Sequence, residues 1–501
     1  MRESDERDDR TRTHPESAPD IDPLVTSKEG SVRERAKDVS RRTVLRASAG
    51  VGVAAVGLGA VASTPVSATS AGDVIWTYGE DLDCSQASTF GAPLTVVDGW
   101  VYAGTTCAHM HVLEAATGNQ VKTIYTNATT NRAPNVVNDI AVFAPNNHEL
   151  KAYDHQEEEA RTKRIWETDV GGTATTRVSA PTVFDGTVYV TNHDGPPYCY
   201  ALELFTGEER WTYDEHELGE APVVDDGVVY ATGRDGVLVA LEADTGDVRW
   251  SFDVGASVES APTVADGRVF VASTDGTLFA VDGGDEEWRF EADGEIQSTP
   301  TVADGTVYVG SFDGHLYAVD ATDGDELWRF ETDEITNSAT VVDGTVFLTS
   351  QGGWLYSVDA STGEANWEFQ ETELNDDLYP NANDPIVVDG VVYVATTDGR
   401  QGRVRALDAG VSGSSEDSRI LLGTTGHHDA WSQTAAVDGR PADGESMGTS
   451  GDDGSSQTDG DGETGGDDDG LPGFGLLGAV ASLAGVSYLL GRRGDGPEME
   501  R

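Results

Sequence analysis

The stretch Ala240-Leu-Glu-Ala-Asp-Thr-Gly-Asp-Val-Arg-Trp250 decides the fold of this chain, because the chain repeats it. Close copies stand at Ala201-Leu-Glu-Leu-Phe-Thr-Gly-Glu-Glu-Arg-Trp211, at Ala318-Val-Asp-Ala-Thr-Asp-Gly-Asp-Glu-Leu-Trp328 and at Ser357-Val-Asp-Ala-Ser-Thr-Gly-Glu-Ala-Asn-Trp367. A spacing of roughly 40 residues indicates one supersecondary unit that is built many times. The repeat predicts the fold but leaves the activity open, since one fold hosts many functions.

One repeat, residues 298–330, reads as four short strands separated by three turns. The turns are Asp304-Gly305, Asp313-Gly314 and Asp323-Gly324, and the runs between them are rich in Val, Tyr, Phe and Trp. Asp-Gly between such runs is a strong hairpin signal, because Gly adopts a positive φ without steric cost. Each repeat is therefore predicted to be a four-stranded antiparallel sheet.

The repeats predict a ring of eight sheets, which is an all-β propeller with eight blades. The aromatic residue of the fourth strand falls at Trp76, Trp166, Trp211, Trp250, Trp288, Trp328 and Trp367, with Ile124 in the remaining slot. Trp76 precedes the first Asp-Gly turn, and the last repeat, 385–408, has no Trp of its own. We therefore expect Val74-Ile-Trp-Thr-Tyr78 to supply the outer strand of the last blade, with residues 419–423 as a rival source.

The Trp and Gly of the repeated phrase are predicted to join neighbouring blades. A blade has two apolar faces and is unstable until its neighbours cover them. The indole carries the largest apolar area and one N–H, so we expect it to pack on the next blade near the Gly of its turn. The turn glycines of the four quoted copies are Gly207, Gly246, Gly324 and Gly363. Proline recurs in the first strand, and because it cannot donate to a ladder, this strand is expected to be an edge at the central channel.

The phrase A-x-D/E-x-x-T/D-G-x-x-x-W resembles the tryptophan-docking motif of the PQQ-type eight-bladed propellers. That family includes quinoprotein alcohol dehydrogenases and the non-enzymatic scaffold lipoprotein BamB. The resemblance covers about residues 73–409. Blade 2 departs from it, because Glu157-Glu158-Glu159 follows Tyr153-Asp154 in place of Thr-Gly, and blade 5 shortens its turn to Gly283-Gly284.

The resemblance implies two different classes of function. A quinoprotein dehydrogenase would bind PQQ and calcium on the propeller axis, with a catalytic Asp and a disulfide between adjacent cysteines. This chain has only Cys84, Cys107 and Cys199, none of them adjacent, and no Cys-x-x-Cys-His haem motif. No catalytic residue, cofactor site or metal site can be assigned, so we expect a binding or scaffold protein. A PQQ-dependent oxidoreductase and a ligand sensor of a membrane complex are the alternatives.

The charge of the chain favours a salt-adapted protein. Its 89 acidic and 32 basic residues give a formal net charge of −57, and the acidic residues run through every blade. Such self-repulsion destabilises a compact chain in dilute buffer, whereas in molar salt the Debye length falls to about 3 Å. The alternative, an acidic tail on an ordinary domain, does not account for acidic blades. Nucleic acid is excluded as a partner because phosphate would be repelled.

The N-terminal region resembles an export signal. Residues 1–39 are polar and expected to be disordered. Residues 40–68 contain Arg41-Arg42 in a twin-arginine-like box, then a Gly/Ala-rich apolar stretch and a small-x-small site at Val66-Ser67-Ala68. An uncleaved short anchor is the alternative reading of this segment.

The C-terminal region predicts attachment to a membrane. Residues 410–470 form an acidic linker rich in Gly, Ser, Asp and Thr, and residues 471–491 form a hydrophobic segment long enough to span a bilayer. The tail 492–501 opens on Arg492-Arg493, which places it in the cytoplasm. Pro472-Gly473-Phe474 resembles the PGF-CTERM sorting signal, so the segment is either processed or kept as an anchor. Together these signals predict a haloarchaeal protein on the outer face of the cell membrane, with an unknown protein or small-molecule partner.

Two pairs of histidines are candidate metal ligands. His109 and His111 share one face of a strand, a geometry that could bind a metal, but His111 stands where Tyr317 stands in another repeat. A core substitution is the simpler account. His427-His428-Asp429 has no counterpart in the repeats and reads as a solvated loop.

The cysteines and one sequon complete the candidate residues. Cys84 and Cys107 flank the first hairpin of blade 1, and a disulfide between them is permitted outside the cell. Cys199 occupies an apolar slot and is expected to pack in the core. Asn127-Ala-Thr129 is a glycosylation sequon near a blade junction.

Overall fold

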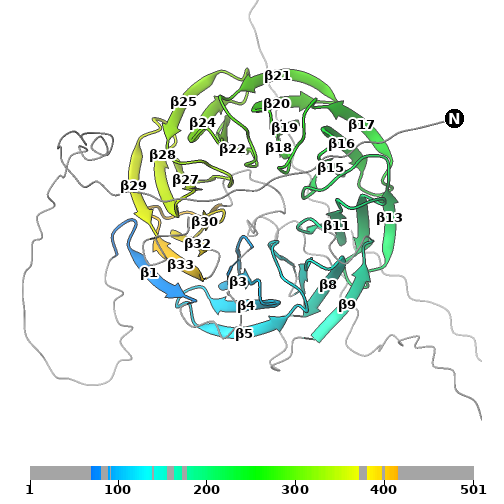
Figure 1. Cartoon of the computed structure of the whole chain (residues 1–501), viewed down its shortest axis with the longest axis horizontal. Helices are drawn as coiled ribbons and strands as arrows, with labels where there is room; N and C mark the ends of the chain where they lie inside the picture. The colour runs from blue at the N-terminus through cyan, green and yellow to red at the C-terminus, as the bar shows by residue number, and fades with distance from the viewer. Residues whose placement is uncertain are drawn as a thin grey trace, which may run out of the picture. The chain divides into compact units, whose positions relative to one another are not determined.

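The computed structural model describes residues 69–79, 89–90, 92–137, 140–154, 163–171, 178–371, 381–397 and 401–415. These residues form a ring of eight antiparallel sheets, in which every regular element is a strand (Figure 1). The eight-bladed propeller that the repeat predicts is confirmed. The predicted N-terminal signal, the predicted linker beyond residue 415, the sorting signal and the His427–Asp429 loop lie outside the described residues, whereas residues 410–415, predicted as the start of the linker, pack on the propeller.

The first four blades follow one another around the ring, each with its strands in sequence order. Blade 1 consists of β2 (Thr95–Val97), β3 (Trp100–Gly104), β4 (His109–Glu114) and β5 (Gln120–Tyr125). Blade 2 consists of β6 (Asn135–Val137), β7 (Ile140–Phe143), β8 (Glu149–Asp154) and β9 (Lys163–Asp169). Blade 3 consists of β10 (Thr182–Phe184), β11 (Thr187–Thr191), β12 (Cys199–Glu203) and β13 (Glu209–Tyr213). Blade 4 consists of β14 (Val223–Asp225), β15 (Val228–Thr232), β16 (Val237–Glu242) and β17 (Val248–Asp253).

The next three blades repeat this order. Blade 5 consists of β18 (Thr263–Ala265), β19 (Arg268–Ala272), β20 (Thr277–Asp282) and β21 (Asp285–Glu291). Blade 6 consists of β22 (Thr301–Ala303), β23 (Thr306–Gly310), β24 (His315–Asp320) and β25 (Glu326–Glu331). Blade 7 consists of β26 (Thr340–Val342), β27 (Thr345–Ser350), β28 (Trp354–Asp359) and β29 (Ala365–Gln370).

Blade 8 joins the two ends of the propeller. Its inner strands are β31 (Ile386–Val388), β32 (Val391–Thr397) and β33 (Gly402–Asp408), and its outer strand is β1 (Val74–Tyr78). Trp76 pairs with Ala406 across β1 and β33, which confirms the predicted closing strand. A short additional strand, β30 (Asn381–Ala382), also pairs with β32, so this sheet has five strands. The rival segment 419–423 lies outside the described residues.

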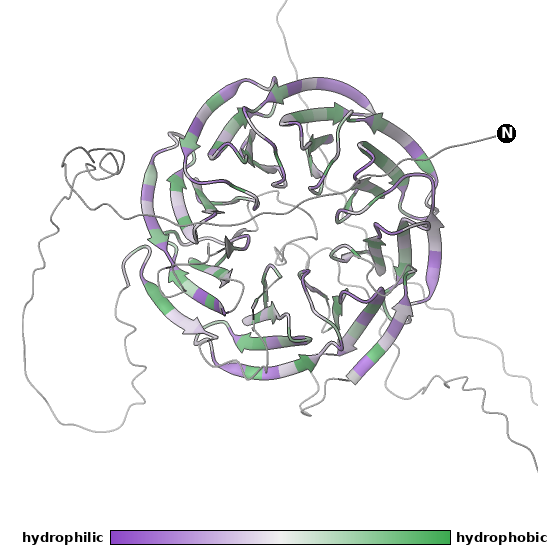
Figure 2. Ribbon diagram, viewed as in Figure 1, coloured by the Kyte–Doolittle hydropathy of each residue, from purple (hydrophilic) through white to green (hydrophobic). Residues whose placement is uncertain are grey.

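The hairpins have the backbone that their Asp-Gly turns predict. Asp304 has a φ of 48° and Gly305 a φ of 78°, so both central residues of the turn are left-handed. Two positive φ values define the type I′ turn that matches the twist of the flanking strands. The outer strands alternate exposed and less exposed residues, as in β17, β25 and β29, and Figure 2 shows the same alternation around the rim.

Each outer Trp packs on the neighbouring blade. The Nε1–H of Trp211 donates to the carbonyl oxygen of Ala243 at 2.7 Å. A Cβ added to Gly246 would lie 2.7 Å from the Trp211 ring, so only glycine leaves room for the indole there. The same bond to the next blade, between 2.7 and 3.3 Å long, is made by Trp76, Trp166, Trp288, Trp328 and Trp367. The ring of Trp250 packs beside Gly284.

The contact between blades 1 and 2 departs from this pattern on both sides. Ile124 takes the place of the Trp and is buried in a cluster with Tyr153. The turn that follows Asp154 lacks the Thr-Gly of other blades. The missing Trp in blade 1 explains the missing Gly in blade 2. In the other blades this turn glycine leaves room for the indole of the preceding blade, and Ile124 has no indole.

The propeller has two different faces. On one face, the turns between strands one and two bond to the turns between strands three and four, as in Ala321 N–H to Gly305 O at 2.9 Å. We call this the turn face. On the other, the loops between strands two and three bond to the connections between blades, as in Ile335 N–H to Ser311 O at 3.1 Å. We call this the loop face.

Candidate functional site: the axial pocket and the loop face

A pocket lies on the axis of the ring. It has a volume of about 160 Å³, and its walls are the residues that lie just before the first strand of each blade. All eight blades contribute, from Pro93 in blade 1 to Asp384 in blade 8. The charged and amide side chains that line it are Arg132, Glu220, Glu259, Gln297, Asn337 and Asp384. We call this site the axial pocket.

Hydrogen bonds between blades hold the walls of the pocket in place. The hydroxyl of Thr182 donates to the carbonyl oxygen of Pro222 at 2.6 Å, so the first strand of one blade is fixed to the proline of the next. Thr95, Thr263 and Thr340 make the same bond to the proline of the following blade, and Thr301 makes it to Ala339, which stands at the proline position in blade 7. The first strands thus begin next to the channel, as predicted, with Pro93 in the pocket wall, and these bonds between blades position the lining side chains.

Three charged residues of the pocket are departures from the repeat. Most blades enter the first strand through small residues, as in Ser179-Ala180-Pro181 and Ser260-Ala261-Pro262. Arg132 and Glu220 stand where these copies have Ser, and Asp384 stands where they have Ala. Reasoning from the repeated phrase alone missed these residues. The sequence does contain a signal for them. In most repeats the two residues before the proline are small, and a charged residue at one of these two positions marks Arg132, Glu220 and Asp384.

Asp384 is the most perturbed carboxyl group of the pocket. The side chain is buried, and one oxygen accepts the backbone N–H of Ser338 at 2.7 Å. Burial raises the pKa of Asp384 to about 6, and the Ser338 bond opposes this rise only in part. Titratable groups that are strongly perturbed inside a cavity are candidates for function.

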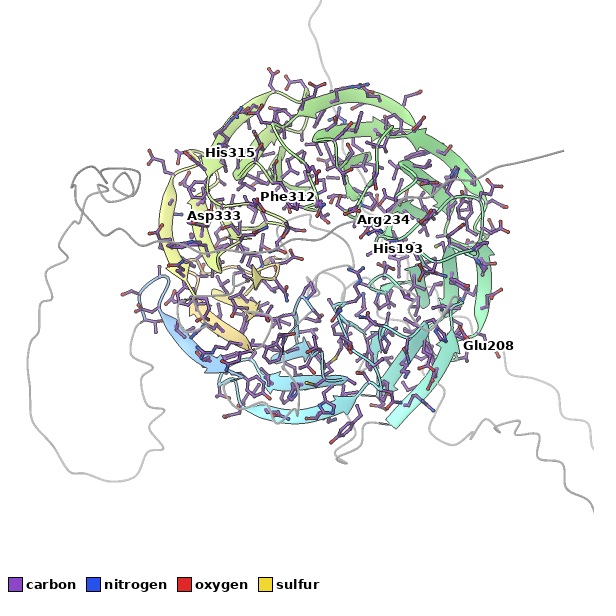
Figure 3. All side chains as sticks on the ribbon, in the orientation of Figure 1. His193, Glu208, Arg234, Phe312, His315 and Asp333 are labelled. Atoms are coloured by element: carbon purple, nitrogen blue, oxygen red, sulfur yellow. The ribbon has the colours of Figure 1, made fainter. Side chains whose placement is uncertain are left out.

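Two basic side chains of the loop face lie beside the other two carboxylates. His193 Nε2 is 3.8 Å from Glu220 Oε1, and Arg234 Nε is 3.4 Å from Glu259 Oε1. Both basic side chains come from the loop between strands two and three of the preceding blade. Figure 3 shows His193, Arg234 and Phe312 toward the axis, whereas Glu208 lies at the outer rim. The loop face therefore surrounds the axis with side chains that differ from blade to blade.

Both ends of the described chain lie on the opposite, turn face. Gly72 N–H bonds to Asp408 O at 2.8 Å, and Ala409 N–H bonds to Gly390 O at 2.9 Å. Gly413 N–H then bonds to the Asp343 carboxylate at 3.0 Å in the first turn of blade 7. The first and last described residues therefore lie on the side of the ring opposite the loop face.

The donor set of the pocket does not fit PQQ with calcium. A planar polycyclic quinone needs ring surfaces or flat apolar walls, and the lining residues of the axial pocket include no aromatic side chain. Calcium needs six to eight oxygen ligands. Among the described residues, no three His, Cys, Asp or Glu side chains are placed to hold a metal ion. We derive no reaction step through either group.

The two histidines of blade 1 lie between blades and away from the axis. His111 is buried, and its Nδ1 lies 2.8 Å from the hydroxyl of Tyr78 in the closing strand β1. That hydroxyl donates to Gln120 Oε1 at 2.6 Å, so His111 Nδ1–H is the donor to Tyr78. Burial lowers the pKa of His111. His109 lies with its ring centroid 6.2 Å from that of His111.

The remaining candidate residues are structural or exposed. Cys199 is a free thiol in the core, and burial raises its pKa to about 12, which makes it inert. Cys107 forms a disulfide, and Cys84 lies outside the described residues. Asn127 is exposed in a turn with a φ of 62°. In the described part of the chain, no helix has the length and apolar character to span a membrane.

Comparisons with known proteins agree with this architecture. The family model described as outer membrane protein assembly factor BamB matches residues 62–195, 157–261, 198–298, 253–368 and 313–433. Curated protein sequences yielded no match. Among solved structures, the computationally designed Ika8 protein is 16% identical with a TM-score of 0.55, over 64% of this chain and 96% of that one.

Two natural proteins of known structure are similar to the same extent. BamB from Moraxella catarrhalis is 16% identical with a TM-score of 0.51, over 66% of this chain and 96% of its own. The quinohemoprotein alcohol dehydrogenase ADHIIG from Pseudomonas putida HK5 is 16% identical with a TM-score of 0.53, over 68% of this chain and 76% of its own. At this identity the likeness shows the fold alone.

Proposed function

The chain belongs to the family described as outer membrane protein assembly factor BamB, and on this premise we propose that it is a binding or scaffold module on the outer face of the cell membrane. The observation that carries the proposal is the placement of the axial pocket and the chain ends. The described ends lie on the turn face, so the anchor that we propose beyond residue 415 would join the propeller on the face opposite the axial pocket.

The location outside the cell rests on the two ends of the sequence. Arg41-Arg42 and the apolar stretch after them support export by the twin-arginine route, and the hydrophobic segment 471–491 supports attachment to the membrane. Pro472-Gly473-Phe474 supports sorting at an archaeal surface. The assembly of outer-membrane proteins, which the family description names, is not part of the proposal.

A binding role is favoured over catalysis because of what the pocket contains. Glu220 lies beside His193, Glu259 lies beside Arg234, and Asp384 is buried, and no group of three possible metal ligands occurs among the described residues. The pocket is concave and has several polar side chains on its walls, which suits recognition. The variable ring of loops around it suits contact with a partner.

Site-directed crosslinking in molar salt tests the proposal. A photoreactive residue at Arg234, on the loop face, is expected to capture a specific ligand or partner in intact cells. The same residue at Glu208, at the outer rim, serves as the matched control. Equal capture from both positions, or fractionation of the protein with the cytoplasm, would contradict the proposal.

A second measurement separates binding from the quinoprotein alternative. Purified protein in molar KCl is mixed with PQQ and Ca²⁺, and dye reduction by alcohols or sugars is followed. We expect no stoichiometric cofactor absorbance and no dye reduction. Both signals together would establish the oxidoreductase reading.

A further inference from the structure

Arg132 is a cation without a counterpart in a strongly acidic protein. It is half-buried and lines the axial pocket from blade 2. Among the described residues, it makes no ion pair and no hydrogen bond. A guanidinium has five donors in a planar fork that matches a carboxylate. A chain of net charge −57 has many carboxylates, yet none in the described part of the chain lies within ion-pair distance of Arg132.

The other charges of the pocket are negative. Asp384 reaches the same pocket from blade 8, and its only named hydrogen bond is the one from Ser338 N–H. Glu220 lines the pocket from blade 4, nearly opposite blade 8 in the ring, and Glu259 lines it from blade 5. Glu259 has Arg234 as a basic neighbour and Glu220 has His193, whereas Asp384 has no basic neighbour within ion-pair distance among the described residues. The acidic side of the pocket is therefore formed by Asp384, together with Glu220 beside its histidine.

The charges of the pocket favour one class of ligand, because a ligand must match both the guanidinium and the carboxylates. A simple anion would satisfy Arg132 but would meet Asp384 and Glu220 with the same sign of charge. A simple cation would satisfy the carboxylates and leave Arg132 unmatched inside a cavity, which is costly. A molecule with one carboxylate and one ammonium group satisfies both sides.

We propose that the axial pocket binds a small zwitterion of the α-amino acid class, with its carboxylate on Arg132 and its ammonium toward Asp384 and Glu220. The inference rests on the proposed binding function and names its ligand. The volume of about 160 Å³ admits a small amino acid. Ala133, Ala180 and Ala221 keep the wall between these groups free of larger side chains.

Matched ligands test the charge argument directly. L-alanine, propionate and propylamine have the same carbon chain length and differ in which charged groups they carry. Each is titrated into the full-length protein in molar KCl, and heat or ligand-detected NMR reports binding. We expect L-alanine to bind about tenfold more tightly than either single-charge analogue. Propionate that binds as well as L-alanine would overturn the zwitterion, and so would the absence of L-alanine binding at millimolar concentration.

Two variants locate the binding. Arg132→Gln keeps the length of the side chain and removes the fork, and it is expected to weaken L-alanine binding about tenfold or more. Asp384→Asn is expected to weaken L-alanine binding and to improve that of propionate. Arg289→Gln, on the outer strand β21, is the control and should leave all three affinities unchanged. An Arg132→Gln protein with unchanged affinity and an unchanged melting temperature would place the ligand elsewhere.

The outcomes keep this inference apart from the proposed function. Specific crosslinking from Arg234 with no L-alanine binding would retain a scaffold and overturn the zwitterion site. L-alanine binding that depends on Arg132, with equal capture from Arg234 and Glu208, would retain the site and overturn the role of the loop face.

Discussion

The indole Nε1–H of Trp76 donates a 2.8 Å hydrogen bond to the carbonyl oxygen of Ala115, and this bond joins the last blade to the first. The Trp76 side chain is buried in the cluster that these two blades share. A Cβ added to Gly118 would lie 2.5 Å from the ring, so the turn of blade 1 fits closely around it.

Replacing Trp76 by Ala is expected to lower the free energy of unfolding by about 3–5 kcal/mol, because a large buried side chain leaves a cavity. Trp328→Ala should have a similar effect, whereas His315→Ala should cost much less. Denaturant unfolding in molar salt measures all three. Equal losses for Trp328→Ala and His315→Ala would contradict blade docking by tryptophan.

Substitutions at two glycines of blade 4 distinguish the cost of a steric overlap with the indole from the cost of a left-handed backbone. Gly246 has a φ of 76° and Gly227 a φ of 74°, but only Gly246 lies against an indole, that of Trp211. Gly227→Ala is expected to cost about 1–2 kcal/mol for the left-handed backbone alone. Gly246→Ala should cost about 1–3 kcal/mol more, because the new methyl group overlaps the ring. Equal melting temperatures for the two variants would show that the turn does not contact the indole closely.

A buried ion pair fixes the closing strand. Arg405 Nε lies 2.5 Å and Nη2 2.8 Å from the two carboxylate oxygens of Glu371, and Arg405 Nη1 donates to Thr77 at 2.8 Å. Glu371→Gln is expected to lower the free energy of unfolding by about 3–5 kcal/mol, because it leaves a buried charge without its partner. Glu242→Gln, which breaks the exposed pair with Arg249, is the control and should change stability far less, because water and salt screen that pair. A Glu371→Gln loss no larger than the control would refute a structural role for the buried pair.

The ring of eight blades could be predicted from the sequence, because the turn residues and the outer Trp recur at a regular spacing. Asp-Gly turns and the outer Trp occur at the same place in most repeats, and the extra Trp76 reveals which strand closes the last blade. The axial pocket was not predicted, because its walls come from connections between blades that have no periodicity of their own. Arg132 and Asp384 are visible only as exceptions to a small-residue pattern. The pair of Glu371 and Arg405 is formed by tertiary structure across 34 residues and has no local signal.

The carboxyl group of Asp384 predicts a pH-dependent stability. Its pKa in the folded state is about 6, above the ordinary value, so the folded state binds a proton more tightly than the unfolded chain. The ionised group therefore lowers stability above pH 6, by about 3 kcal/mol for a shift of about two pKa units, and this cost is relieved as the pH falls toward 4.

Asp384→Asn keeps an acceptor for Ser338 N–H and removes the charge. It is expected to raise the free energy of unfolding at pH 8, and the gain should fall to about half by pH 5. Unfolding of both proteins at the two pH values checks this. A gain that is the same at both pH values would mean that Asp384 does not titrate in this range.

The charge of −57 predicts a requirement for salt. Dialysis from molar KCl to dilute buffer is expected to unfold the propeller, because screening of the carboxylates is lost. Circular dichroism follows the loss of strand structure. Full retention of the native spectrum in dilute buffer would contradict the salt-adapted reading.

The pairing of β1 with β33 has a consequence for synthesis. Thr77 and Arg405 are 328 residues apart, so the first strand to leave the ribosome has no partner until nearly all of the propeller has been translated. A nascent chain that stops before β33 keeps an unpaired strand at one end and an open sheet edge at the other, which chaperones and proteases recognise. Closure of the circle thus depends on translation of the whole propeller, through Asp408.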